Sequence, residues 1–505
     1  MKTLDRLRQL DVEAGLVERT AALLSWDQET CMPSAAIGER ADQLAFLEAL
    51  AHGKRTLPET GELLLSLGSV SENPEGDACL PEMDRAYLRI LRRAWDRATK
   101  IPAGLVAEMA RAASLSQAAW AKAKEQDDYG AFAPHLKKMI DYNRRIASCL
   151  DPGARAYDVL LDRFEEGETE ASIAAVLGNL KQELLPLLDR IRGRPQLDDA
   201  FLRRPCPKAA QAALSARLLE LLGFDTARGR LDTAAHPFST TLGSSDVRIT
   251  TRYEEDYFPS SMYGTIHECG HALYELGVDP APEYRRTSLA TASSMAIHES
   301  QSRLWENLVG RSRAFCETQL PEMSRSLSPV LDGVSTEAYY RGINRVEASL
   351  IRTDADEVSY SLHIILRFEL EGALLSGDLS ITDLPAAWNA GMKRLLGVEP
   401  ASDAKGCLQD MHWAFGAIGY FPSYALGNLY AAQWWAAMGE QGLQPDQAVA
   451  DGGFSRILDW LRQNVHKPGC MFRPAELVRR GSGRPLDPSL FVDYLKEKFA
   501  GVYGF

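Results

Sequence analysis

Apolar residues recur at three- and four-residue intervals along most of this chain, and this period restricts the fold more than any other feature of the sequence. Segments 4–29, 81–100 and 134–150 follow it in the first part of the chain, and 336–377 and 420–439 follow it in the second. Such spacing places apolar side chains on one face of an α-helix, which must then pack against other helices. The sequence therefore predicts a mostly α-helical fold.

One stretch departs from the helical period and alternates instead. Val247, Ile249 and Thr251 are separated by more polar residues, and they follow the turn-forming run HPFSTTLGSS. Alternation with a period of two is typical of a strand with one buried face. We therefore expect a small β-hairpin or sheet just before residues 267–271.

Length alone would allow one large domain or several ordinary ones. A Pro- and Arg-rich stretch that begins at residue 192, RGRPQLDDAFLRRPCPKAAQ, is the best candidate for a loop between two lobes, 1–195 and 205–505. This loop need not separate independent domains, and no period in the sequence indicates internal repeats. We therefore predict a single large domain that spans residues 1–505.

The charge balance opposes a nucleic-acid or membrane surface. Lys and Arg number 56 against 69 Asp and Glu, which gives a formal net charge of −13, whereas such surfaces need clustered basic residues. The N-terminal run MKTLDRLRQLDVEAGL alternates charges where a secretory signal would be apolar, and no segment approaches the roughly 18 apolar residues of a membrane span. We expect a cytoplasmic protein in which most of the eight scattered cysteines are reduced.

The sequence HECGH at residues 267–271 is the clearest chemical motif of the chain. On a helix, positions four apart differ by about 40°, so His267 and His271 can reach one metal ion. Glu268 lies beside them, where it can act on a metal-bound water. Cys269 lies about 200° from His267 and should point away from the ion. This pattern predicts a zinc peptidase helix.

The helix that carries the motif has its own boundary signals. Ser260 and Ser261 can cap its start, and Gly277 can end it. A catalytic zinc site also needs a third protein ligand. The helical segment SMAIHESQSRLWENLVG supplies two neighbouring candidates, Glu299 and His298, and the helical period does not choose between them.

Several motifs, taken together and in order, resemble the thermostable carboxypeptidase (carboxypeptidase Taq) family of zinc peptidases. Beyond HECGH, the motifs that carry the resemblance are LLSWDQETCMP (23–33), HPF (236–238), DVRIT (246–250), HESQ (298–301), IRTDADE (351–357), GCLQDMHW (406–413) and GYFPSYALGN (419–428). The resemblance implies an elongated, largely helical fold, similar to neurolysin and angiotensin-converting enzyme, in which two lobes flank a deep groove. It also implies a homodimer.

The resemblance also implies roles for individual residues. It makes Glu299, rather than His298, the third metal ligand beside His267 and His271. By similarity to neurolysin-like enzymes, His412 and Tyr424 would stabilise the oxyanion.

Three arginines concern the substrate and the predicted ligands. A carboxypeptidase must recognise a free α-carboxylate, and an arginine does this best. The candidates are Arg352 and Arg248, because each lies inside a family-like motif. Many related peptidases place an aspartate four residues after the glutamate ligand, whereas this chain has Arg303 there. The residue that orients the histidine ligands is therefore not identified.

The expected activity is removal of C-terminal residues from peptides, with Glu268 as general base. An oligopeptidase that cuts internally would use the same chemistry, and a zinc-dependent peptide-binding protein without turnover is a third reading. Zinc suits two histidines and a carboxylate, although cobalt or manganese could take the same ligands. A peptide with a free C-terminus is the expected partner.

Overall fold

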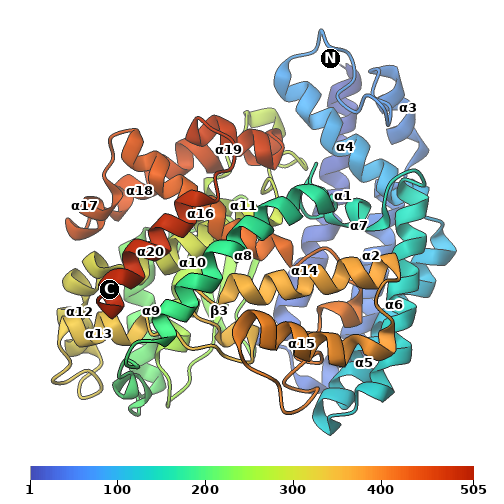
Figure 1. The fold of residues 1–505 in the computed structure, drawn as a ribbon. Helices are drawn as coiled ribbons and strands as arrows, with labels where there is room; N and C mark the ends of the chain where they lie inside the picture. Colours follow the sequence, from blue (N-terminus) through green and yellow to red (C-terminus); the bar gives the residue numbers. More distant parts are fainter. Residues whose placement is uncertain (1) are drawn as a thin grey trace.

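The computed structural model describes residues 2–505, and helices make up most of it (Figure 1). Its α-helices are α1 (Lys2–Thr30), α2 (Ile37–Arg55), α3 (Pro58–Ser66), α4 (Glu82–Lys100), α5 (Ala103–Gln126), α6 (Tyr129–Leu150), α7 (Ala156–Leu161), α8 (Glu170–Arg192), α9 (Lys208–Leu222), α10 (Pro259–Gly277), α11 (Met295–Arg303), α12 (Arg313–Ser326), α13 (Thr336–Ile343), α14 (Tyr360–Ser376), α15 (Leu384–Leu396), α16 (Pro422–Glu440), α17 (Pro445–Ala450), α18 (Phe454–Leu461), α19 (Pro474–Ser482) and α20 (Ser489–Tyr503).

Shorter helical pieces connect these elements. The π-helical segments are Leu304–Gly310 and Arg462–His466. The 3₁₀ turns are Ser34–Ala36, Ala200–Arg203, Pro282–Tyr284, Arg352–Asp354, Ile381–Asp383, His412–Phe415 and Gly469–Met471. Serine side chains begin several α-helices, because Ser294, Ser312 and Ser335 each accept a hydrogen bond from the backbone N–H three residues later.

The strands form one small sheet, as the alternating pattern predicts, but with three strands. β2 (Ser239–Gly243) and β3 (Asp246–Thr251) pair antiparallel as the expected hairpin. β1 (Gly229–Thr233) adds a parallel pairing to β3, which the sequence did not indicate because its residues show no alternation of apolar side chains. Val247 and Ile249 are fully buried, so the sheet turns the predicted face to the core.

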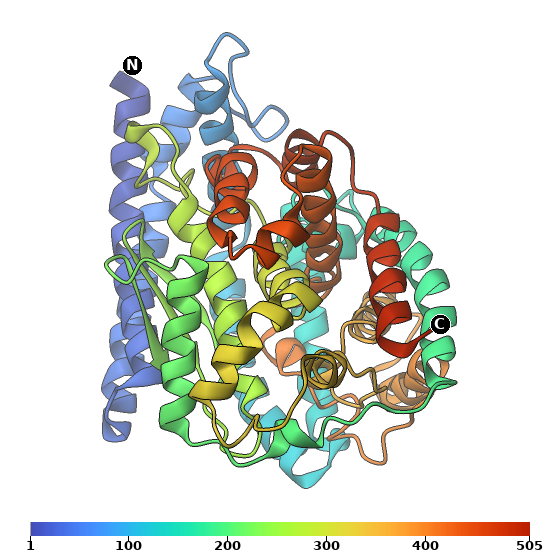
Figure 2. The same cartoon turned by 90° about the vertical axis from the view of Figure 1, so that its left-hand side faces the viewer.

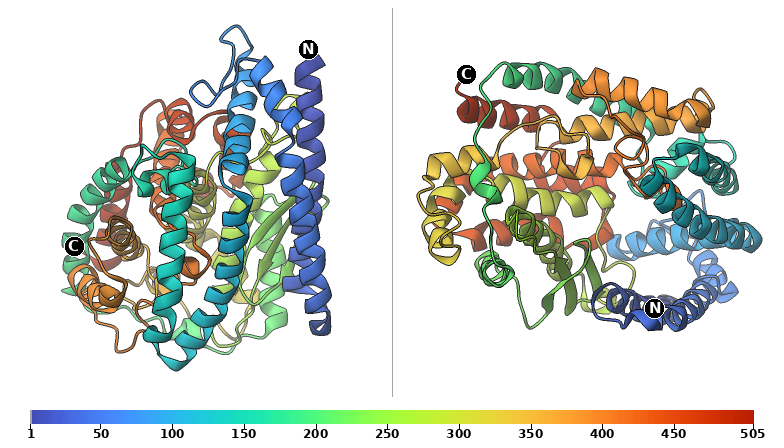
Figure 3. Two further views of the ribbon diagram at one scale, coloured as in Figure 1. Left: turned by 90° about the vertical axis from the view of Figure 1, so that its right-hand side faces the viewer. Right: turned by 90° about the horizontal axis from the view of Figure 1, so that it is seen from below.

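The helices surround this sheet on several sides. Figure 2 shows α1 running beside the strands, and Figure 3 shows α8 and α20 side by side at a distance from them. The main apolar core includes residues from Ala123 to Tyr503 and so draws on both predicted lobes. A second cluster joins α1, α3 and α4 to the loop at Tyr284 and Leu289. The boundary between lobes at residues 195–205 stays a prediction.

Helix α10 covers the segment that the sequence predicts, but its start is built differently. Neither serine caps it: Pro259 occupies the first turn, and no side-chain cap bond forms at Phe258. The Ser261 hydroxyl instead donates a 2.7 Å hydrogen bond to Gln211 on α9. The expected capping role is therefore wrong, because burial of this end makes the serine a partner of α9.

Two further expectations concern the whole chain. Each helix within residues 2–505 is too short or too polar to cross a lipid bilayer. All eight cysteines are free thiols, and five of them are buried.

Candidate metal centre

Three side chains from two helices converge on one point. His267 and His271 extend from α10, and Glu299 extends from α11. The Oε2 atom of Glu299 lies 3.7 Å from Nε2 of His267 and 3.4 Å from Nε2 of His271. One ligand atom from each residue lies within 4.8 Å of the other two, so the set could hold one metal ion.

Two glycines allow the helices to approach closely enough for this convergence. A Cβ atom on Gly270, inside the HECGH motif, would lie 2.6 Å from the carbonyl oxygen of Gln301 on α11. A Cβ atom on Gly427 of α16 would lie 2.7 Å from Cγ of Glu299. Helix α11 is therefore packed closely between α10 and α16.

Glu306 orients the first histidine. Its Oε2 atom lies 2.9 Å from Nδ1 of His267, so the tautomer with the proton on Nδ1 leaves Nε2 free for a metal ion. Burial raises the pKa of the Glu306 carboxyl, but the bond to His267 and the charges of Arg303 and Arg311 outweigh it and hold that pKa low. Sequence reasoning missed this residue because Glu306 lies in the π-helical segment, seven positions after Glu299 rather than four.

Arg303 occupies the position where many related peptidases have an aspartate, and it contacts Glu299 directly. Its Nε atom donates a 2.7 Å hydrogen bond to Oε1 of Glu299. The other carboxylate oxygen, Oε2, is the one that faces the two histidines. Arg303 thus holds the Glu299 carboxylate in place and leaves Oε2, which also accepts a 3.1 Å hydrogen bond from Ser302, as the oxygen available to a metal ion.

His298 lies beside the centre but outside the converging set. Its Nε2 atom lies 3.0 Å from Oε1 of Glu275, and its Nδ1 atom lies 2.5 Å from Nδ1 of His271. The His298 carbonyl oxygen lies 3.1 Å from the same Nδ1. His298 and Glu275 therefore orient His271, much as Glu306 orients His267.

The residues present fit a divalent metal ion. Two imidazole nitrogens and one carboxylate oxygen form the donor set of a catalytic zinc site with an open position. Both histidines have their Nδ1 atoms engaged, so their Nε2 atoms, which face Glu299, are available to a metal ion. Burial lowers the pKa of His271 to about 3, which keeps this imidazole neutral and able to bind a metal.

Glu268 has the environment of a general base. It directly follows His267 on α10 and is only 7% exposed. Burial raises the pKa of its carboxyl to about 7. A carboxylate whose pKa lies near neutrality can both take a proton from water and return it.

The predicted oxyanion residues lie next to each other. The hydroxyl of Tyr424, on α16, lies 3.5 Å from Nε2 of His412, in the 3₁₀ turn His412–Phe415. Burial lowers the pKa of His412 to about 4, so its imidazole is neutral at pH 7. A neutral imidazole and a phenol are both hydrogen-bond donors suited to a developing oxyanion.

The two arginine candidates for the substrate carboxylate have different surroundings. Arg352 is buried, and its Nε and Nη2 atoms donate to Oδ1 of Asp410 at 3.1 and 2.9 Å. Its guanidinium also lies 5.0 Å from the ring centre of Tyr424, beside the predicted oxyanion pair.

Arg248 lies on β3. It pairs with Asp246 at 3.0 Å and stacks over Trp26 of α1. Its side chain retains 16% exposure. The structure therefore brings Arg352, and not Arg248, into contact with another predicted site residue.

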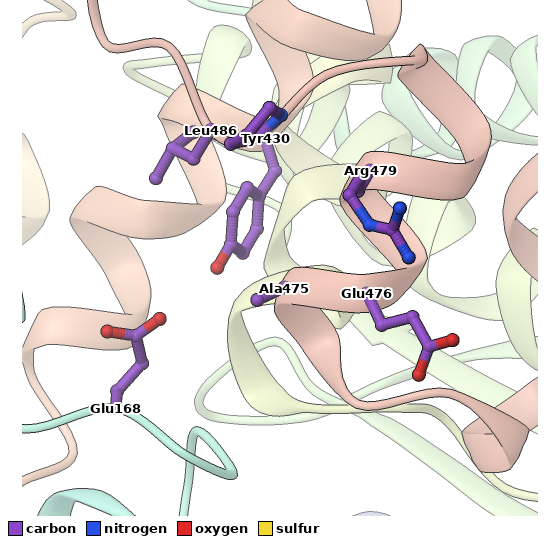
Figure 4. Close-up of a pocket in the computed structure, with 7 residues that line it drawn as sticks. Glu168, Tyr430, Ala475, Glu476, Arg479 and Leu486 are labelled. Carbon is purple, nitrogen blue, oxygen red and sulfur yellow. The ribbon is translucent and has the colours of Figure 1, made fainter.

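Surface hollows occur away from the converging ligands. One of about 440 Å³ is lined by Glu168, Tyr430, Ala475, Glu476, Arg479, Pro485 and Leu486 (Figure 4). Another of about 250 Å³ lies between α1, the sheet and the end of α10, where Glu275 reaches it. Neither hollow includes a predicted ligand.

A helical fold in which an HExxH helix and a glutamate from a second helix converge defines a metallopeptidase by class. Comparison with known families agrees with this geometry: the model of the carboxypeptidase Taq (M32) metallopeptidases matches residues 6–499. The chain belongs to this family and is a metal-dependent carboxypeptidase. The resemblance, the mostly helical fold and the enzyme class predicted from sequence are thereby confirmed.

Individual relatives match over nearly their whole length. Thermostable carboxypeptidase 1 of Thermus thermophilus is 42% identical over 514 residues, which cover 99% of this chain and 98% of the relative. The crystal structure of the M32 carboxypeptidase from Deinococcus radiodurans is 38% identical, with a TM-score of 0.95 and 100% of both chains covered. An apo-Mg structure of Pyrococcus furiosus carboxypeptidase is 36% identical, with a TM-score of 0.94 and 99% of both chains covered.

Proposed function

We propose that this carboxypeptidase is a zinc enzyme that removes residues from peptides with a free C-terminus, with Glu268 as its general base. The observation that carries the proposal is the convergence of His267, His271 and Glu299 beside a buried Glu268. Both histidines are oriented by their Nδ1 atoms, which is the arrangement expected of zinc ligands. Cobalt or manganese could take the same ligands.

The chain's own residues perform the proton transfers. When bound, the metal supplies Lewis-acid polarisation of the scissile carbonyl and lowers the pKa of a water molecule. Glu268 accepts the proton of the attacking water and then delivers it to the nitrogen of the leaving amino acid. The burial that raises the pKa of Glu268 favours this return of the proton.

His412 and Tyr424 act on the substrate oxygen. As water attacks, the carbonyl oxygen gains negative charge that two hydrogen-bond donors can stabilise. The Tyr424 hydroxyl lies 3.5 Å from Nε2 of His412, and this proximity supports a shared target for the two donors. Loss of either donor should lower kcat by roughly 10²-fold to 10³-fold.

An arginine is proposed to bind the terminal carboxylate of the substrate. Arg352 is favoured over Arg248 because its guanidinium lies over Tyr424. Asp410 occupies Nε and one hydrogen of Nη2, and Nη1 donates to Tyr360, so the remaining N–H groups would serve the substrate. Arg248→Lys and Arg352→Lys, compared on one peptide, separate the two: the docking residue raises KM for free-acid peptides more than tenfold, because lysine cannot form the paired contact.

The test of the activity uses one short peptide in two forms, with its C-terminus free and amidated. Zinc-loaded wild-type protein and Glu268→Gln are incubated with each form, and products are followed by mass spectrometry. Stepwise loss of C-terminal residues from the free form alone, absent in the variant, is the expected result. Cleavage of both forms would instead favour the oligopeptidase, and zinc binding without any cleavage would favour a peptide-binding protein.

Three further properties remain part of the proposal. The acidic net charge supports a protein without nucleic-acid or membrane partners. A cytoplasmic location is proposed from the sequence and is tested by fractionation of cells that express the protein. A homodimer is proposed from the resemblance to the family, and sedimentation equilibrium would give twice the chain mass if that is correct.

A further inference from the structure

Glu371 is a fully buried carboxylate in the middle of α14 that collects three hydrogen bonds from three separate segments. Trp413 Nε1 donates to its Oε1 atom at 2.8 Å. The backbone N–H of Gly419 and the hydroxyl of Tyr157, on α7, donate to its Oε2 atom at 3.0 and 2.8 Å. Arg367, whose charge acts on Glu371, forms its ion pair with Asp410 instead.

Two of these donors belong to the segment 412–419, which begins at His412. Trp413 directly follows His412, and Gly419 closes the same loop just before α16 begins with its Tyr424. Within the loop, the backbone N–H of Ala417 donates to the carbonyl oxygen of His412 at 3.0 Å. Glu371 therefore ties both ends of a closed turn to the core helix α14.

The imidazole of His412 has almost no hydrogen bonds of its own. Its Nδ1 atom is buried and has no hydrogen-bond partner within residues 2–505. Its Nε2 atom has only the long, 3.5 Å contact with Tyr424. Aromatic rings surround it, with the ring centre of Phe421 at 4.7 Å and that of Tyr420 at 5.4 Å. Because no strong hydrogen bond holds the ring itself, its place depends on this aromatic packing and on the backbone segment that carries it.

We propose that Glu371 is a positioning residue that sets the place of His412 by holding Trp413 and Gly419. The inference rests on the oxyanion role proposed above for His412. The carboxylate acts through the loop and does not touch the substrate itself.

A carboxylate is needed because the two loop donors are both N–H groups. A glutamine at this position would offer one oxygen and one NH₂ group. Whichever way the amide lies, its NH₂ group would face either the Trp413 indole N–H or the Gly419 N–H, and neither can accept a hydrogen bond. Glu371→Gln should therefore release one end of the loop while changing the side-chain volume very little.

The test is a double-mutant cycle between Glu371→Gln and His412→Ala, measured on a peptide with a free C-terminus. Glu371→Gln should lower kcat by roughly 10-fold to 100-fold, because a displacement near 1 Å of a catalytic group costs about that much. KM and the metal dissociation constant should change less than about twofold. In the His412→Ala background, Glu371→Gln should lower kcat less than about twofold further.

Control variants separate positioning from a general loss of stability. Glu357→Gln replaces a different buried carboxylate, the ion-pair partner of Lys498. This variant should leave kcat unchanged. If Glu371→Gln does not fold, as judged by circular dichroism, Trp413→Phe removes only one loop donor and should show the same loss of kcat in the same cycle.

Three results would overturn the proposal for Glu371. Effects on kcat that multiply in the double variant, or a metal affinity that falls with activity, would overturn the positioning role while leaving that of His412 intact. A His412→Ala variant with wild-type kcat would refute the oxyanion role itself, and this inference with it.

Discussion

Glu306 and His267 are 39 positions apart in the chain, yet Oε2 of the first lies 2.9 Å from Nδ1 of the second. The contact exists because the π-helical segment Leu304–Gly310 continues α11 along the flank of α10. It sets the tautomer of a predicted metal ligand from a residue that is not itself a ligand.

Replacement of that carboxylate should weaken metal binding. Glu306→Gln is expected to raise the metal dissociation constant about 10-fold to 100-fold, as loss of an outer partner of a histidine ligand typically does. Competition with a chromogenic chelator measures it. Glu337→Gln, at an exposed ion pair with Arg313, serves as the control and should bind metal normally. Equal affinities in both variants would show that His267 needs no such partner.

Close contact between α10 and α11 should make Gly270 intolerant of a side chain. Alanine usually stabilises a helix by up to about 1 kcal/mol relative to glycine. At Gly270, however, its Cβ atom would lie 2.6 Å from a backbone oxygen, and we expect Gly270→Ala to cost about 1–3 kcal/mol in urea unfolding. Gly264→Ala on the same helix has 3.6 Å of space and should be neutral or stabilising. Identical unfolding midpoints would contradict the packing argument.

The pH dependence of stability should carry a contribution from Glu165. Burial raises the pKa of this carboxyl to about 8, although the N–H of Ala296 and the hydroxyls of Ser294 and Ser423 oppose the rise. Unfolded glutamate releases its proton near pH 4.5, whereas the folded protein keeps it to about pH 8. The associated stability is therefore complete below pH 4.5 and is lost as the pH rises through 8.

Glu165→Gln isolates this contribution from other titrating groups. Glu168, Tyr274 and Tyr430 are the ionisable neighbours, and they remain in the variant. The difference in Tm between variant and wild type should grow in favour of glutamine as the pH rises from 5 to 8. A difference that stays constant over this range would mean that Glu165 titrates normally.

The buried pair of Lys498 and Glu357 should show strong coupling. Nζ of Lys498 lies 2.7 Å from Oε2 of Glu357, and their side chains are only 6% and 4% exposed. Either Lys498→Met or Glu357→Gln alone should cost about 3–5 kcal/mol, because it leaves the other charge buried without a partner. The double variant should cost clearly less than the sum of the two, as measured by urea unfolding. Additive losses would indicate that water solvates the pair.

Local rules of the sequence determined the helical class and the geometry of HECGH. Spacing four apart on a helix places His267 and His271 on one face wherever the helix lies, because helical periodicity depends only on nearby residues. The alternating residues of β3 predicted a strand for the same reason. Glu299 became the expected third ligand only through the resemblance, since the helical period left His298 equally open.

Tertiary packing decided what surrounds these residues. The pairing of Glu306 with His267, of Glu275 with His298 and of Asp410 with Arg352 joins residues from different elements, and no local period encodes such contacts. Strand β1 likewise exists because β3 offers it an edge, although its own residues do not alternate. The sequence by itself determined the motif helix and the class of enzyme. Only the packing of helices against one another decided which charges orient the ligands, because hydrogen bonds between elements depend on how those elements approach in space.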